Sequence, residues 1–235
     1  MFTVAKKEIS TYFKSPIAYV LIGLFMLMIS ILFYTPFSVG SGDFMVVLKN
    51  MGFFLVFLVP IMTMRILAED RKNGTEVLLL TSPTSLTSIV LGKFFAMYFV
   101  FLVITVLSMI YPIIQFAFGG VLTVQLVGGY IGFLLLGASF VSIGVFASAL
   151  TENQIVAAII SFVSLLIMWM ADAFSTQVSN SFIASVMGWL SLLSRYNVFT
   201  NGILGLPEIV YFLLFTALFI FLTIRVIERR RWVQG

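Results

Sequence analysis

Long apolar stretches separated by short polar breaks dominate the chain. A transmembrane helix needs about 20 mainly apolar residues. Six segments of the sequence reach or approach that length, and they cover residues 17–37, 51–68, 89–116, 124–150, 154–171 and 207–227. The pattern therefore predicts an all-α membrane protein in which residues 1–235 form one transmembrane domain with six spans.

The composition supports a bilayer as the solvent and removes most catalytic chemistry. Only 9% of the residues are charged and 61% are hydrophobic, whereas soluble domains carry about 25% charged residues. The absence of cysteine and histidine excludes thiolate nucleophiles, zinc–thiolate sites and imidazole acid–base catalysis. Gly92-Lys93 lacks the other residues of a phosphate-binding loop. We expect no catalytic residue, no metal, no cofactor bound by this chain and no nucleic-acid partner.

The basic residues predict the orientation in the cell membrane. Six spans put both termini on one side, and eleven of the thirteen basic residues fall on that side. Only Lys49 and Arg195 fall on the other. By the positive-inside rule, both termini should be cytoplasmic. In an alternative topology the short fifth segment is re-entrant and the C-terminus lies outside, but the basic run at 229–231 disfavours it.

Residues 1–16 have the pattern of an amphipathic helix. Apolar residues from Phe2 to Phe13 share one face, and lysines occupy the other. Such a helix lies in the membrane interface, with its lysines at anionic headgroups. Alternatively, this segment is only a basic flank that enforces the topology.

The cytoplasmic segment 69–88 is too long and too patterned to be a simple link. Polar residues end the second span, Gly74 permits the positive φ of a helix stop, and Thr75 can cap a short helix that carries Leu78, Leu79 and Leu80. The apolar side chains of this helix need a lipid surface or a protein groove. The residues alone leave both open.

Two further regions lie on or near the outer side. Residues 172–206 are half-apolar and predict short interfacial or re-entrant helices, which form either an extracellular gate or a passive cap. Pro112 predicts a kink near the outer end of the third span, and small residues at four-residue spacing in the fourth span predict close helix packing.

No charged residue lies near the middle of a span, which disfavours ion-coupled carriers and voltage sensors.

Several stretches carry a family resemblance. The main one reads Glu69-Asp70-Arg71-Lys72-x-Gly74-Thr75-Glu76-x-Leu78-Leu79-Leu80-Thr81-x-Pro83, and Ile89-Val90-Leu91-Gly92-Lys93-Phe94 follows it. Further matches are Lys7-Glu8-Ile9-x-x-Tyr12-Phe13-x-Ser15-Pro16 and Gly202-Ile203-Leu204-x-Leu206-Pro207-Glu208-Ile209-Val210-Tyr211-Phe212. Together these stretches resemble the ATP-binding-cassette type 2 permease family, and most closely its gliding-motility-associated branch.

The resemblance implies a half-transporter that dimerises, as a homodimer or a heterodimer, and binds two cytoplasmic ATPase subunits that hold ATP and Mg²⁺. It also allows an auxiliary membrane subunit. It implies that segment 69–88 is a coupling region seated in the ATPase. The residues expected at that interface are Glu69, Asp70, Arg71, Lys72, Gly74, Thr75, Glu76, Leu78, Leu79 and Leu80.

We therefore expect the permease subunit of an ATP-driven exporter. An alternative is an ATPase-linked membrane anchor that transmits force to a surface apparatus without moving a solute. A passive channel or secondary carrier is a third hypothesis, and the uncharged middle of the spans disfavours it. The sequence does not identify the substrate.

Overall fold

The structure, a computed structural model, describes residues 1–38, 44–76, 84–119, 124–175 and 181–233. These residues are almost entirely helical, and they contain no strand. The helices are α1 (Phe2–Lys14), α2 (Pro16–Ser38), α3 (Phe44–Thr63), α4 (Ala68–Lys72), α6 (Leu86–Ser108), α7 (Ile110–Ala117), α8 (Val124–Leu150), α9 (Gln154–Ser175), α10 (Ser181–Leu190), α11 (Leu192–Thr200) and α12 (Leu206–Val233).

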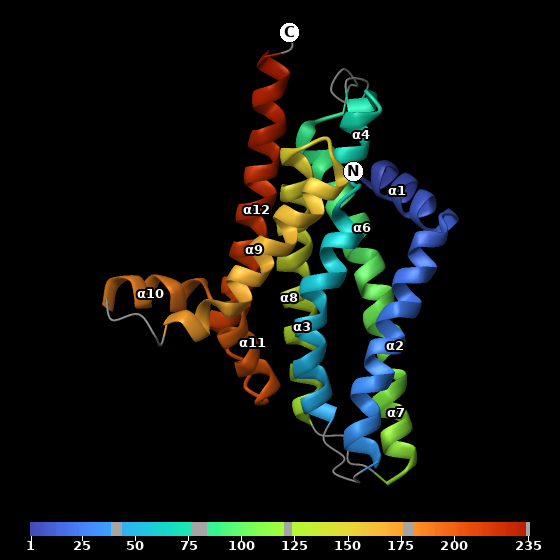
Figure 1. The fold of residues 1–235 in the computed structure, drawn as a ribbon, viewed down its shortest axis with the longest axis vertical. Helices are drawn as coiled ribbons and strands as arrows, with labels where there is room; N and C mark the ends of the chain where they lie inside the picture. Colours follow the sequence, from blue (N-terminus) through green and yellow to red (C-terminus); the bar gives the residue numbers. More distant parts are fainter. Residues whose placement is uncertain (39–43, 77–83, 120–123, 176–180, 234–235) are drawn as a thin grey trace.

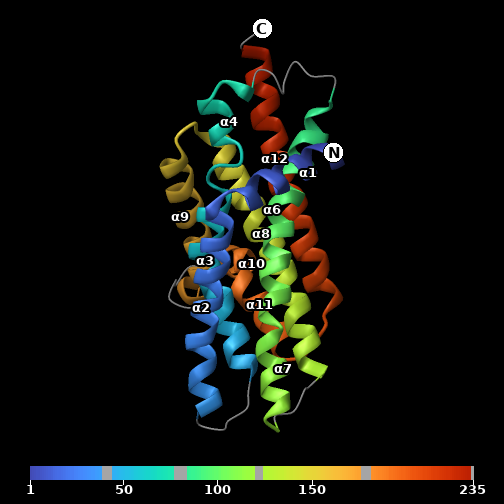
Figure 2. The same cartoon turned by 90° about the vertical axis from the view of Figure 1, so that its right-hand side faces the viewer.

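Six stretches are long and apolar enough to cross a bilayer, which confirms the predicted all-helical architecture with six candidate spans. They are Pro16–Tyr34, Phe44–Lys72, Leu86–Ala117, Gln125–Leu150, Gln154–Ser175 and Leu206–Arg230. The long helices run roughly side by side, and both ends of the described chain lie at the same end of the bundle as α4 (Figures 1 and 2). We call this end of the bundle the terminal end.

The second span begins earlier than its apolar run indicates. Helix α3 starts at Phe44 and not near Met51, so Lys49 lies within the helix. Its exposed ammonium group donates a hydrogen bond to Asn201 Oδ1 at 3.2 Å. Because Lys49 is near the end of the helix, the charge reaches a polar partner without breaking the helix.

Helix α8 forms the centre of the bundle. It packs against α3, α6, α9, α11 and α12, and its small residues permit this close approach. A Cβ atom at Gly144 would overlap the side chain of Thr63 on α3, and one at Gly137 would overlap the ring of Phe101 on α6. The predicted use of small residues for helix packing is thus confirmed, and the partner helices belong to the same chain.

The third span is broken at its far end. Helix α6 ends at Ser108 and α7 begins at Ile110, so the break lies just ahead of Pro112. Proline has no N–H and its ring clashes with the carbonyl four residues earlier. That carbonyl belongs to Ser108, which explains why the helix is interrupted there.

Candidate functional site

A buried lysine at the terminal end joins three helical elements. Lys93 on α6 is only 1% exposed, and its ammonium group lies 2.9 Å from Glu8 Oε1 and 2.5 Å from Asp70 Oδ2. It also donates to the carbonyl of Ile66 at 2.7 Å. Glu8 belongs to α1 and Asp70 to α4. We call Lys93, Glu8 and Asp70 the Lys93 cluster.

The Lys93 cluster satisfies a charge that would otherwise be costly. An ammonium group in an apolar bundle loses its hydration, and oppositely charged partners with good geometry offset that loss. The side chains of Glu8 and Asp70 are 17% and 21% exposed, so the cluster lies just beneath the surface. It ties the first turns of α6 to α1 and to α4.

Asp70 also holds the residues that follow α4. The hydroxyl of Thr75 lies 3.1 Å from both the backbone carbonyl and Oδ1 of Asp70. Gly74, between them, has a φ of 70°, which confirms the predicted positive φ. Residues other than glycine rarely adopt this backbone conformation. The turn after α4 is therefore closed onto Asp70 by one glycine and one hydroxyl.

The break between α3 and α4 is anchored to α8 by one hydroxyl. Ser148 Oγ accepts from the N–H groups of Leu67 and Ala68 at 3.1 and 3.0 Å. The same hydroxyl donates to the carbonyl of Met64 at 3.0 Å. These backbone groups lie at helix ends and lack regular helical partners. Ser148 therefore replaces the missing hydrogen bonds and fixes the start of α4 against α8.

More distant ion pairs extend the connections of this segment. Arg65 and Glu69 form a pair one helical turn apart at 2.8 Å, and Arg71 lies 3.8 Å from Glu152 in the α8–α9 turn. Glu76 lies 3.6 Å from Arg230 on α12. Segment 65–76 thus contacts α1, α6, the α8–α9 turn and α12 through polar groups.

Helix α1 packs on the bundle through part of its apolar face. Tyr12 is buried, and its hydroxyl donates to the carbonyl of Met62 at 3.4 Å. Burial raises the pKa of this phenol well above its usual range. Ile9 and Phe13 pack against the core, whereas Phe2 is 82% exposed. Only part of the face that the sequence assigns to lipid is therefore free to meet it.

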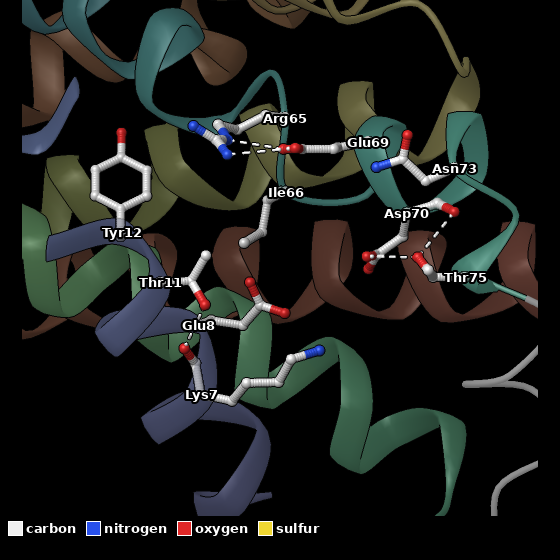
Figure 3. A pocket seen from close by; sticks show the side chains of 10 residues that line it. All are labelled: Lys7, Glu8, Thr11, Tyr12, Arg65, Ile66, Glu69, Asp70, Asn73 and Thr75. Carbon is white, nitrogen blue, oxygen red and sulfur yellow. Dashed lines mark hydrogen bonds and ion pairs between the residues drawn. The ribbon is translucent and has the colours of Figure 1, made fainter. Parts of the chain in front are cut away.

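A cavity of about 310 Å³ lies between α1 and segment 65–75. Figure 3 shows Lys7, Glu8, Thr11 and Tyr12 lining it from α1, and the side chains of segment 65–75 lining it from the other side. Charged groups of both signs surround the cavity. Arg65 and Glu69 pair with each other, and Glu8 and Asp70 both pair with Lys93. The cavity therefore separates α1 from α4 except where the Lys93 cluster bridges them, and Tyr12 ties α1 to the end of α3.

The residues predicted to contact an ATPase have different surroundings. Glu69, Asp70, Arg71, Thr75 and Glu76 have polar partners within the chain, whereas Lys72 and Gly74 are exposed. Leu78, Leu79 and Leu80 lie outside the described residues.

Sequence reasoning missed the roles of Lys93, Glu8, Ser148 and Arg230. Lys93 carried a usable signal, because it is a lone charge inside the run Leu86–Ser108. Such a charge needs a counter-charge from elsewhere in the fold. Ser148 carried no comparable signal, since serine is common in the fourth span for packing reasons alone.

Comparison with known proteins gives one result that bears on the whole bundle. A family model described as "ABC-2 family transporter protein" matches residues 35–226. A comparison with curated proteins finds no match. The matched range includes α4, Lys93 and Ser148, and it excludes α1 with Glu8.

Proposed function

The chain belongs to the ABC-2 transporter family, and on this premise we propose that it is the permease subunit of an ATP-driven exporter. It is a multi-pass membrane protein, and permeases of this family work with ABC ATPases and dimerise. In this proposal a separate cytoplasmic ATPase holds ATP and Mg²⁺, and this chain supplies only the membrane path and the surface on which the ATPase acts.

The observation that carries this proposal is the Lys93 cluster. Residues 69–88 dock on the ATPase, and α4 at the start of this segment is attached to α1 and α6 through one buried ammonium group. A displacement of α4 must therefore move Glu8 and Lys93 with it, or break a buried ion pair at considerable cost. The second and third spans meet at this point, so both would tilt together.

The remaining contacts distribute the same displacement over the bundle. Ser148 connects the start of α4 to the central helix α8, and Glu76 contacts Arg230 on the last span. Nucleotide binding to the ATPase would shift the permease between inward- and outward-facing states only to the extent that docking favours one of them. The polar contacts of segment 65–76 connect the second span to the third, fourth and sixth spans, so such a bias would act on all four.

Orientation and the flanking helices complete the proposal. The terminal end is cytoplasmic, in accordance with the distribution of basic residues, and the membrane is the inner or plasma membrane. Helix α1 lies in the interface, with Phe2 toward lipid and its exposed lysines toward headgroups. We further propose that α10 and α11 are re-entrant, and their position beside the bundle, at a level between the two ends of α8 (Figure 1), supports this.

The docking of segment 69–88 can be tested by assembly and by ATP hydrolysis. The purified chain alone should hydrolyse no ATP, and vesicles that also contain its ATPase should do so. Leu79→Asp places a charge on the expected apolar contact and should abolish co-purification or uncouple hydrolysis from transport. The matched control, Leu79→Met, keeps the volume and apolar character and should behave as wild type. Normal assembly and transport with Leu79→Asp would refute the docking site.

A further inference from the structure

A largely apolar groove lies far along the chain from the Lys93 cluster. Residues of α10, α11 and the first turns of α12 line a space of about 600 Å³. One wall is a stripe of Val210, Leu214 and Leu218 on successive turns of α12, and these side chains are 44%, 65% and 51% exposed. Trp189 on α10 stands at the same groove.

One charged side chain lines this groove. The guanidinium carbon of Arg195 lies 4.0 Å from the centre of the Tyr211 ring, a cation–π contact. Its Nε is buried and has no hydrogen-bond partner in the described part of the chain. Across residues 1–38, 44–76, 84–119, 124–175 and 181–233, no carboxylate forms an ion pair with it.

A guanidinium that has no carboxylate partner among the described residues favours an anion as its neighbour. A cation over an aromatic ring gains some attraction. Arg195 is only partly exposed and its Nε is buried, and the lost hydration exceeds what one such contact restores. The contrast with Lys93 is informative, because that ammonium group has two carboxylates and a carbonyl around it. Arg195 is also one of only two basic residues that the sequence places opposite the terminal end.

The groove has the shape of a lipid site. Its apolar stripe follows the axis of a candidate span, and from Pro207 to Leu218 a helix rises about 16 Å. Figure 1 shows α10 projecting sideways from the bundle between the levels of the two ends of α8, where a bilayer would surround it. Trp189 forms an edge-to-face contact with Tyr211, with ring centres 5.8 Å apart, so an aromatic side chain stands beside the guanidinium of Arg195.

We propose that this groove binds a phospholipid of the surrounding bilayer, with its phosphate at Arg195 and an acyl chain along Val210, Leu214 and Leu218. Anionic headgroups are preferred over zwitterionic ones, because a choline group already neutralises its own phosphate and Arg195 supplies one positive charge. The inference goes beyond the proposed function and does not depend on it, since no part of it requires ATP or an ATPase.

Trp189 provides a direct probe of the site. The chain has three tryptophans, so Trp169→Phe together with Trp232→Phe leaves Trp189 as the only one. The full chain is placed in nanodiscs of phosphatidylcholine that contain a fixed fraction of lipid with brominated acyl chains, carried either by phosphatidylglycerol or by phosphatidylcholine. Brominated phosphatidylglycerol should quench Trp189 at about fivefold lower mole fraction, as one basic residue near the surface predicts.

Variants assign the preference to Arg195. Arg195→Gln should abolish the difference between the two brominated lipids, while Arg195→Lys, which keeps the charge, should retain part of it. Lys49→Gln removes the other basic residue of that side and should leave the preference unchanged. Should Arg195→Gln fail to fold, the wild-type comparison alone decides.

Three results would overturn the lipid site. Equal quenching by the two lipids in the wild-type background would remove the charge preference, and a preference that persists in Arg195→Gln would assign it elsewhere. Quenching by neither lipid would mean that the groove is covered, for example by a second copy of the chain. None of these results bears on ATPase docking, so the two proposals fail separately.

Discussion

Replacement of Lys93 by methionine should destabilise the fold more than any other single loss of charge at the terminal end. The substitution keeps the apolar part of the side chain and removes the ammonium group that contacts Glu8, Asp70 and the carbonyl of Ile66. Two carboxylates then face each other without a cation between them. Removal of one partner from a buried ion pair costs about 3–5 kcal/mol.

The lower end of that range applies here. Glu8 and Asp70 are 17% and 21% exposed, so their carboxylates can recover part of their hydration when the cation is lost. We therefore expect a loss of about 3 kcal/mol in the free energy of unfolding. The measurement is thermal or denaturant unfolding of the full chain in detergent. Lys72→Met is the matched control, because Lys72 is exposed and its replacement should change stability by less than about 0.5 kcal/mol.

A combined variant separates charge from packing. Glu8→Gln, Asp70→Asn and Lys93→Met together remove all three charges, so no carboxylate remains unpaired, and most of the lost stability should return. That triple variant should nevertheless couple poorly to the ATPase, since α4 is then held to α1 and α6 without an ion pair. If Lys93→Met is as stable as Lys72→Met, the reasoning about the Lys93 cluster is refuted.

Three further predictions concern contacts around the same segment and in the core. Ser148→Ala leaves the N–H groups of Leu67 and Ala68 without their acceptor and should cost about 1–3 kcal/mol of unfolding free energy. The control Ser142→Ala loses only a hydrogen bond within its own helix and should cost less. Equal losses in the two variants would contradict the role of Ser148. Gly144→Ala should lower stability by about 1–3 kcal/mol because its Cβ meets Thr63, while Gly23→Ala, at a position with open space, should be neutral or stabilising. The pKa of Tyr12 is raised above its ordinary value of 10.0, so the protonated phenol contributes to the free energy of unfolding fully below pH 10 and loses this contribution as the pH rises further. Melting temperatures above pH 10 should therefore fall less steeply in Tyr12→Phe than in wild type. Identical slopes would contradict the buried position of the phenol.

The six spans could be predicted from the sequence because the signal is local. Each apolar run contains its own reason to enter a bilayer, whatever the other runs do. The exact ends were harder to predict. The apolar run of the second span begins only after Lys49, whereas the structure includes Lys49 in α3 and gives it a hydrogen-bond partner, Asn201, that is 152 residues away. Only the fold brings such partners together.

The polar contacts at the candidate site could be predicted only in part. Gly74 and the polar run before it were recognisable from residue types alone. The ion pair between Lys93 and Glu8 joins residues 85 positions apart, and the sequence indicates only that Lys93 needs some counter-charge. Arg195 stood out as an exception to the positive-inside pattern, but its groove depends on how α10 and α11 fold back beside α12.

The central claim is that a separate ATPase acts on this chain through segment 69–88, and cross-linking tests it most directly. The sequence contains no cysteine, so Lys72→Cys and Asn201→Cys each introduce a single thiol at an exposed position. The first lies at the end of α4 and the second near the opposite end of α3. With a short thiol-reactive cross-linker in native membranes, the account predicts a covalent product with the ATPase from Lys72→Cys and none from Asn201→Cys. A product from Asn201→Cys, or none from Lys72→Cys in membranes where the complex is assembled, would contradict it.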